Sequence, residues 1–179
     1  MRQSITRAQY TSTRQTAESV YDVPMSIDRL DSRLLNALAD SPRAGVMELA
    51  RQLGVARGTV QARLDKLQAR GIVTGFTPDV DLPALGYEVT AFVTLDIAQG
   101  RLDDVVSHLR DLPEVVEAHS VTGPGDLLCR VVARSNRHLQ QVINSILEVQ
   151  GIERTATHIG LTEQIAFRVL PLIRHLGQD

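Results

Sequence analysis

Tryptophan is absent from this 179-residue chain, and aromatic side chains make up only 3% of it. We therefore do not expect a binding surface that stacks bases on aromatic rings. The single cysteine, Cys129, excludes an internal disulfide and is typical of a reducing compartment. No apolar run approaches the roughly 20 residues that a membrane-spanning helix needs, so the sequence predicts a soluble protein with no membrane partner.

Charge of opposite sign collects in two parts of the chain. Residues 27–75 carry eight basic side chains against five acidic ones, a net charge of +3. Residues 76–179 carry eight arginines against fourteen acidic side chains, a net charge of −6. A basic part joined to an acidic part indicates that only the basic part meets a polyanion.

The first 25 residues are rich in Ser, Thr, Gln and Arg and poor in aliphatic side chains. Such a segment buries too little apolar surface to offset the entropy of ordering, which predicts a disordered arm over residues 1–25. Its arginines and few acidic residues also resemble an organelle transit peptide. A loose basic arm along a phosphate backbone is a third interpretation, and all three stay open.

Helical spacing of apolar residues predicts three helices in the basic part. Ser26 is the expected N-cap of the first helix, which Pro42 interrupts. The second helix runs from about Val46 to Leu53 and ends at Gly54. The third runs from about Arg57 to Ala69.

The segment after the third helix, "IVTGFTPDVD", reads as a short extended ribbon that would lie beside the helices as a wing. Pro78 and Pro83 then mark a linker. We expect a helical domain at 26–77, a linker at 78–87 and a second domain at 88–179.

From Tyr87 onward the apolar period changes to two, and strands alternate with helices. The expected order is βαββαβ, with strands at 89–97, 115–121, 127–133 and 152–161 and a hairpin turn at "TGPGD". This order predicts a ferredoxin-like sandwich, with helices on one face of an antiparallel sheet. A last alternating run over Ile165, Phe167 and Val169 would add an edge strand.

The outward positions of the third predicted helix combine small residues with cations at the rims. The outward centre reads Gly58, Gln61, Ala62 and Asp65. This pattern suits a helix in a major groove, where the cations meet phosphates on both walls. An ordinary three-helix bundle with a solvated basic face fits the same pattern, so the residues alone leave both interpretations open.

A resemblance to a known family covers residues 27 to about 172. The order "DRLDSRLLNAL…MELARQLGVARGTVQARLDKLQARGIVTGFTPDVD", followed by "VTGPGD" and "GIERTATHIGL", resembles the Lrp/AsnC family. These are the leucine-responsive, or feast/famine, transcription regulators of bacteria and archaea. The resemblance implies an α+β protein with an N-terminal winged helix-turn-helix domain and a C-terminal ferredoxin-like βαββαβ sandwich that senses amino acids.

The resemblance also implies partners. These are double-stranded DNA, a small amino-acid effector of unknown identity, and further copies of the chain. Dimers would pair through the C-terminal sheets and often assemble into octamers, as tetramers of dimers. Such regulators act in the cytoplasm on the nucleoid and need neither metal nor cofactor.

For DNA, the resemblance points to the third helix and its end. Gln61 would pair with an adenine edge, whereas Arg63, Lys66 and Arg70 would contact phosphates. Relatives usually carry Ser where Ala56 stands, so this helix lacks a capping hydroxyl. The matching positions are Arg57, Gly58, Thr59, Gln61, Ala62, Arg63, Lys66 and Arg70.

For the effector, the resemblance points to the hairpin loop and the fourth strand. Backbone N–H groups beside the two glycines would converge on a carboxylate, and Asp126 would accept from an ammonium group. The fourth strand is expected to be remote from the hairpin within one chain, so a shared site would use two subunits. Glycines in a hairpin also serve the turn alone. The matching positions are Val121, Thr122, Gly123, Gly125, Asp126, Leu127, Thr155 and Thr157.

Two other classes of function remain as alternatives. An architectural protein that compacts DNA without an effector would use the same helices. A ferredoxin-like enzyme explains residues 87–172 but not the attached basic helices. "GPGDLL" lacks the third glycine of a dinucleotide-binding fingerprint, and no histidine stands at metal-ligand spacing from another histidine or the cysteine. We therefore expect no catalytic residues and no metal site.

Overall fold

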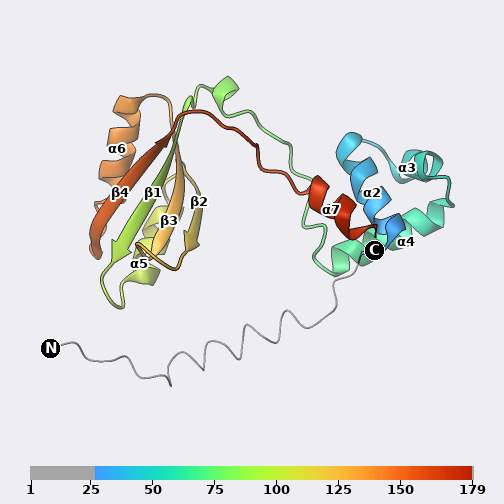
Figure 1. Cartoon of the computed structure of the whole chain (residues 1–179), viewed down its shortest axis with the longest axis horizontal. Coiled ribbons are helices and arrows are strands. Elements are labelled where there is room, and N and C mark those ends of the chain that lie inside the picture. The colour runs from blue at the N-terminus through green and yellow to red at the C-terminus, as the bar shows by residue number, and fades with distance from the viewer. Residues whose placement is uncertain (1–26, 179) are drawn as a thin grey trace, which may run out of the picture. The chain divides into compact units, whose positions relative to one another are not determined.

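The computed structural model describes residues 27–178, so the predicted arm at 1–25 and the expected cap Ser26 lie outside the described residues. The described chain divides into two units (Figure 1). The helical unit consists of residues 27–77 and 167–178, and the sheet unit of residues 78–166. Residues 167–178 thus belong with the helices and not with the sheet.

Three helices form the first part of the helical unit: α2 (Arg29–Asp40), α3 (Val46–Leu53) and α4 (Arg57–Ala69). The expected second and third helices are confirmed. The first begins later than predicted, because Asp28 and not Ser26 is its N-cap. The Asp28 carboxylate accepts the N–H of Asp31 at 2.8 Å, and the Asp31 carboxylate accepts the N–H of Asp28 at 3.2 Å. This reciprocal capping box satisfies two N–H groups that a helix start leaves unpaired.

The turn between α3 and α4 depends on a glycine. Gly54 has φ = 69°, in the left-handed region, and its N–H donates to the carbonyl of Arg51 at 3.3 Å. A side chain at this position would be strained. Arg33 of α2 donates to the carbonyl of Leu53 at 3.0 Å, which covers the end of α3 from outside the helix.

The core of the helical unit is formed mainly by leucines. Leu34, Leu49 and Leu67 are each 1% exposed, and Ile173 from the far end of the chain packs against the cluster. The buried members are Ile27, Leu34, Leu35, Leu49, Ala50, Leu53, Val60 and Leu67.

A fourth helix of this unit, α7 (Leu170–Leu176), was not predicted. The predicted edge strand over 165–169 is wrong, because residues 161–169 form no strand. Proline in the first turn of α7 suits a helix start, where its missing N–H has no role. The helix packs on α2, since Ser32 Oγ donates to the carbonyl of Ile173 at 3.0 Å.

The predicted wing is also wrong. Residues 74–81 form no hydrogen-bonded strand, and the segment then enters a short 3₁₀ turn, η1 (Pro83–Leu85). An extended segment becomes a wing only when a second strand pairs with it. In the described chain the helix-turn-helix therefore stands without a β-wing.

The sheet unit has the predicted order: β1 (Val89–Ile97), α5 (Leu102–Arg110), β2 (Val115–Ser120), β3 (Leu127–Ala133), α6 (Asn136–Ile146) and β4 (Ile152–Gly160). The strands lie in the order β2-β3-β1-β4, and every neighbouring pair is antiparallel. The ferredoxin-like prediction is confirmed.

Alternate residues of β1 divide the sheet into two faces. Ala91, Val93 and Leu95 are fully buried against apolar side chains of α5 and α6. Cys129 pairs with Val93 on this covered face, and burial raises the pKa of its thiol to about 11. The opposite face carries Phe92, which is 42% exposed. We call this uncovered side of the sheet the open face.

Candidate functional site

The exposed side of α4 lies between two cationic side chains, Arg57 and Lys66. Val60 and Leu67 are each 1% exposed and hold the helix to the core of the helical unit. On the other side, the outward positions are small or polar, which allows a close approach by a large partner. The exposed predicted residues are Arg57, Gly58, Thr59, Gln61, Ala62 and Lys66.

Gln61 is the residue predicted to read an adenine edge, and it already has a partner. Its Nε2 donates to Asp65 Oδ1 at 2.7 Å, one helical turn further along. Exposed pairs at this spacing are worth only about 0.2–0.5 kcal/mol. Gln61 can therefore leave Asp65 for a stronger partner at little cost.

Arg63 lies differently from the other predicted DNA contacts. Its guanidinium pairs with the carboxylates of Asp28 and Asp31, the second at 3.0 Å. Asp31 is only 3% exposed, so Arg63 neutralises a buried charge. We assign Arg63 to holding α4 against the start of α2, and not to a phosphate.

The same cluster shifts two pKa values. Hydrogen bonds to Asp28 and then to Asp31 raise the pKa of Arg63 above its ordinary value. Slight burial favours the protonated form of Asp28, but the N–H of Asp31 and the guanidinium of Arg63 outweigh it and lower the Asp28 pKa. Neither aspartate was predicted as a functional residue from the sequence, although their three-residue spacing before an apolar run signals a capping box. Arg70, at the C-cap of α4, is half-buried.

The hairpin loop between β2 and β3 is tied to the end of β1. The N–H of Asp126 donates to the carbonyl of Leu95 at 2.8 Å, and Asp126 Oδ2 accepts the N–H of Ile97 at 2.7 Å. Gly125 has φ = 82°, and a Cβ there would clash with the Thr94 methyl group. Both residues thus have structural roles. These two hydrogen bonds use the N–H and Oδ2 of Asp126 and do not involve its Oδ1.

The two predicted threonines lie on β4, on the helix-covered face. Thr155 pairs with Leu95, and Thr157 pairs with Val93. Because Leu95 also pairs with Leu127, only β1 separates β4 from the base of the hairpin. The strand order is the expected one, with β4 at the opposite edge of the sheet from β2, and a site shared by the hairpin and β4 of two subunits stays a prediction. Thr155 Oγ1 is buried and has no hydrogen-bond partner among residues 27–178.

Comparison with known proteins assigns both units. Residues 27–68 match the AsnC-type helix-turn-helix domain, and residues 90–168 match the Lrp/AsnC ligand binding domain. The chain is 36% identical over 147 residues to the regulatory protein AsnC of Escherichia coli K12, covering 81% of this chain and 97% of that one. The chain belongs to the Lrp/AsnC family. As a member of this family, it is a transcription regulator with an AsnC-type helix-turn-helix.

Solved structures agree with this Lrp/AsnC assignment. The structure of E. coli AsnC matches with a TM-score of 0.75 and 35% identity, covering 81% of this chain and 99% of the other. A feast or famine regulatory protein of M. tuberculosis, complexed with L-methionine, matches with a TM-score of 0.69 and 29% identity, over 79% of this chain and 96% of that one. The similar proteins of this family are named as transcription regulators.

Two further features bear on partners. Among the described residues, no helix is long and apolar enough to cross a membrane. Within residues 27–178, no group of three or more His, Cys, Asp or Glu side chains is placed to hold a metal ion.

Proposed function

We propose that this Lrp/AsnC regulator binds double-stranded DNA through α4 and that an amino acid bound to the sheet unit changes its DNA binding or its assembly. The observation that carries the proposal is the exposed side of α4, where small side chains lie between Arg57 and Lys66 on a helix fixed by Arg63. Such a helix fits a major groove, with its cations on the phosphates. The place of action is then the nucleoid in the cytoplasm.

The proposed DNA contacts divide into two kinds. Gly58 and Ala62 allow close approach, and Thr59 and Gln61 provide the groups that read base edges. Arg57, Lys66 and Arg70 contribute sequence-independent phosphate contacts. Because few long donors stand on the outermost stripe, affinity comes mainly from phosphates, DNA shape and multivalent assembly.

The proposed effector site combines the hairpin loop of one subunit with β4 of another. The remaining carboxylate oxygen of Asp126 accepts from the ammonium group, and N–H groups beside Gly123 and Gly125 bind the carboxylate. Support comes from the buried, unpartnered Thr155 Oγ1, because a buried hydroxyl without a partner is costly unless something binds it. The M. tuberculosis relative with L-methionine makes an amino acid the first ligand class to test.

We also propose dimers through the open face of the sheet, with octamers formed from four dimers. Phe92 is exposed there, and it pairs with Arg130 on β3 and His158 on β4. Arg130 Nε is buried without a hydrogen-bond partner among the described residues. A second copy on this face covers the phenyl ring and supplies an acceptor.

The test is a titration of the protein on its own upstream DNA and on an unrelated duplex, at fixed salt, with and without a panel of amino acids. Selective binding to the upstream DNA, with an affinity that changes when one amino acid is added, supports the proposal of an effector-responsive regulator. Equal binding to both duplexes, unmoved by any amino acid, favours the architectural alternative. Absence of binding to either contradicts the assignment of α4.

Two variants separate recognition of the effector from the structure of the loop. Asp126→Asn keeps an oxygen for the Ile97 N–H but loses the charge, so it abolishes the amino-acid shift while the sheet remains stable. Asp126→Ala loses both. If Asp126→Asn retains the full shift, the ammonium contact is wrong.

A further inference from the structure

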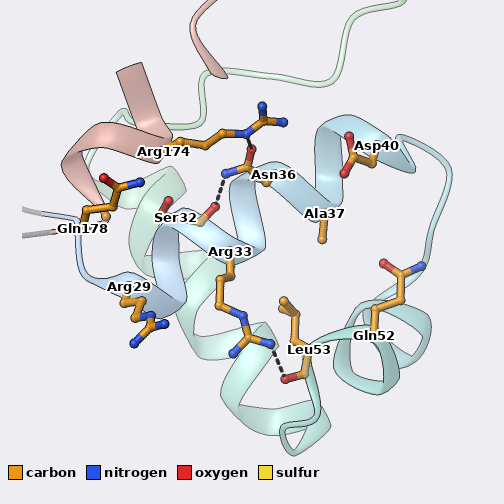
Figure 2. A pocket seen from close by; sticks show the side chains of 11 residues that line it. Arg29, Ser32, Arg33, Asn36, Ala37, Asp40, Gln52, Leu53, Arg174 and Gln178 are labelled. Carbon is orange, nitrogen blue, oxygen red and sulfur yellow. Dashed lines mark hydrogen bonds between the residues drawn. The ribbon is translucent and has the colours of Figure 1, made fainter. Parts of the chain in front are cut away.

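A cavity of about 560 Å³ opens between α2, the end of α3 and α7 in the helical unit (Figure 2). Arg29 and Arg33 of α2 line one end of it, and Arg174 of α7 lines the side. Asp40 lies at the opposite end of α2. The cavity is therefore lined by three guanidinium groups and a single carboxylate.

None of these three arginines has its charge neutralised by a described residue. Arg33 donates to the backbone carbonyl of Leu53 at 3.0 Å, and Arg174 Nε donates to Asn36 Oδ1 at 2.7 Å. Both acceptors are neutral, so each bond orients a guanidinium and leaves its charge in place. Arg29 makes no hydrogen bond or ion pair within residues 27–178.

The placement of Arg29 and Arg33 is unfavourable for the fold alone. They stand four residues apart on one side of α2, where like charges destabilise a helix. Arg29 is the first residue of α2, so its charge also opposes the helix dipole. The acidic residues of this helix start, Asp28 and Asp31, are both engaged by Arg63.

We propose that the Arg29 and Arg33 end of this cavity binds a phosphate group. Two guanidiniums offer paired N–H donors that match phosphate oxygens, and the Gln178 amide lines the same cavity. A bound phosphate anion reduces the repulsion between the arginines and complements the start of α2. The phosphate comes either from a DNA backbone or from a free phosphate-bearing molecule. This site belongs to the helical unit, whereas the proposed amino-acid site belongs to the sheet unit.

The first experiment measures binding of inorganic phosphate to the full chain by calorimetry, with chloride at equal ionic strength as the reference. Arg29→Gln weakens phosphate binding about tenfold, the loss expected for one charge-assisted contact. Because Arg29 makes no hydrogen bond or ion pair within residues 27–178 and its charge opposes both Arg33 and the helix dipole, the variant unfolds at the same temperature as the parent or slightly above it in the absence of phosphate. Arg137→Gln, an exposed residue of α6, is the matched control and leaves binding unchanged.

The second experiment identifies the source of the phosphate from the salt dependence of DNA binding. If the site takes a DNA phosphate, Arg29→Gln reduces the slope of log K against log salt by about 1. If the site takes a free phosphate, that slope stays unchanged, while the affinity of the variant for inorganic phosphate is still reduced. A variant that alters neither the phosphate affinity nor the slope overturns the proposal.

Discussion

The two units of this regulator are stabilised in different ways. Among the described residues, the core of the sheet unit contains twelve buried side chains, most of them with no exposed surface. The core of the helical unit contains eight, and each of them retains a trace of exposure. Among the described residues, the buried side chains of the sheet unit are apolar, whereas the smaller core of the helical unit is accompanied by two buried polar residues, Asp31 and Ser32.

Several contacts in the helical unit come from distant parts of the chain. Arg63 reaches back to Asp28 and Asp31, and Arg33 covers the end of α3. Ile173 enters the core from α7. A small domain buries a smaller fraction of its surface and has less stability to spare. The helical unit therefore depends on a few individual contacts, each of which a single substitution removes.

The largest expected effect is in the core of the sheet unit. Leu95→Ala empties a fully buried position and lowers the free energy of unfolding of this unit by about 2–5 kcal/mol. Hydrogen exchange read out by mass spectrometry resolves the two units, and protection falls in β1, β3 and β4 while α2 to α4 keep theirs. Val80→Ala, at a position 50% exposed, is the control in the same unit. A loss of protection spread equally over both units contradicts the comparison.

The next effect is in the charged cluster of the helical unit. Arg63→Met leaves Asp31 buried without its cation and lowers the free energy of unfolding of this unit by about 1–3 kcal/mol at pH 7. Because Asp28 has a lowered pKa in the folded state, its contribution is present above the ordinary carboxylate pKa and is lost as the pH falls through the folded value. The difference between variant and parent therefore narrows as the medium is acidified below about pH 4. Lys66→Met, an exposed change on the same helix, tests whether loss of charge alone is enough.

A smaller effect is expected from the removal of α7, the helix from the far end of the chain that packs on α2. A chain ending at residue 169 loses the packing of Ile173 and the Ser32 hydrogen bond, and the helical unit becomes less stable by about 1–2 kcal/mol. Exchange of the α2 amides should rise about tenfold, with no change in the sheet unit. Gly177→Ala is the matched point variant, because a Cβ there would clash with Ser32. Unchanged α2 protection in both variants means that α7 adds nothing to the unit.

The smallest expected effect is a gain in the stability of the helical unit. Ala56 is the N-cap of α4 and offers no side-chain hydrogen bond. Ala56→Ser supplies an oxygen for an unpaired N–H and stabilises the helical unit by about 0.5–1 kcal/mol. Thermal unfolding of the variant should shift upward, whereas Ala56→Val, without an oxygen, should not stabilise. A variant with serine that unfolds with the parent indicates that solvent already satisfies this helix start.

Elements defined by local signals were predictable. Gly54 ends α3, and alternation with period two marks β1 and β3, because these signals act through neighbouring residues. The wing and the edge strand failed for a shared reason: an extended pattern becomes a strand only when a partner pairs with it. Directly after the predicted edge strand, the sequence does carry signals for the helix α7: Pro171 stands in its first turn and Gly177 stands past its end.

The candidate site was predictable only where exposure follows from helix geometry. The outward residues of α4 were identified from their spacing, and they are exposed. The role of Arg63 was not, because its partners stand 32 and 35 residues earlier in the chain. Which carboxylates meet a given cation depends on how α2 crosses α4, and that crossing is a property of the packed core.

The burial of Cys129 makes its thiol a probe of local opening in the sheet unit. Its thiol is the only one in the chain, it has no exposed surface, and its pKa of about 11 keeps it protonated at neutral pH. A thiol-reactive dye therefore labels the native protein only when β3 opens, and the labelling rate reports the frequency of that opening. A cysteine engineered onto the helical unit would react at once, so one reagent would time events in the two units separately.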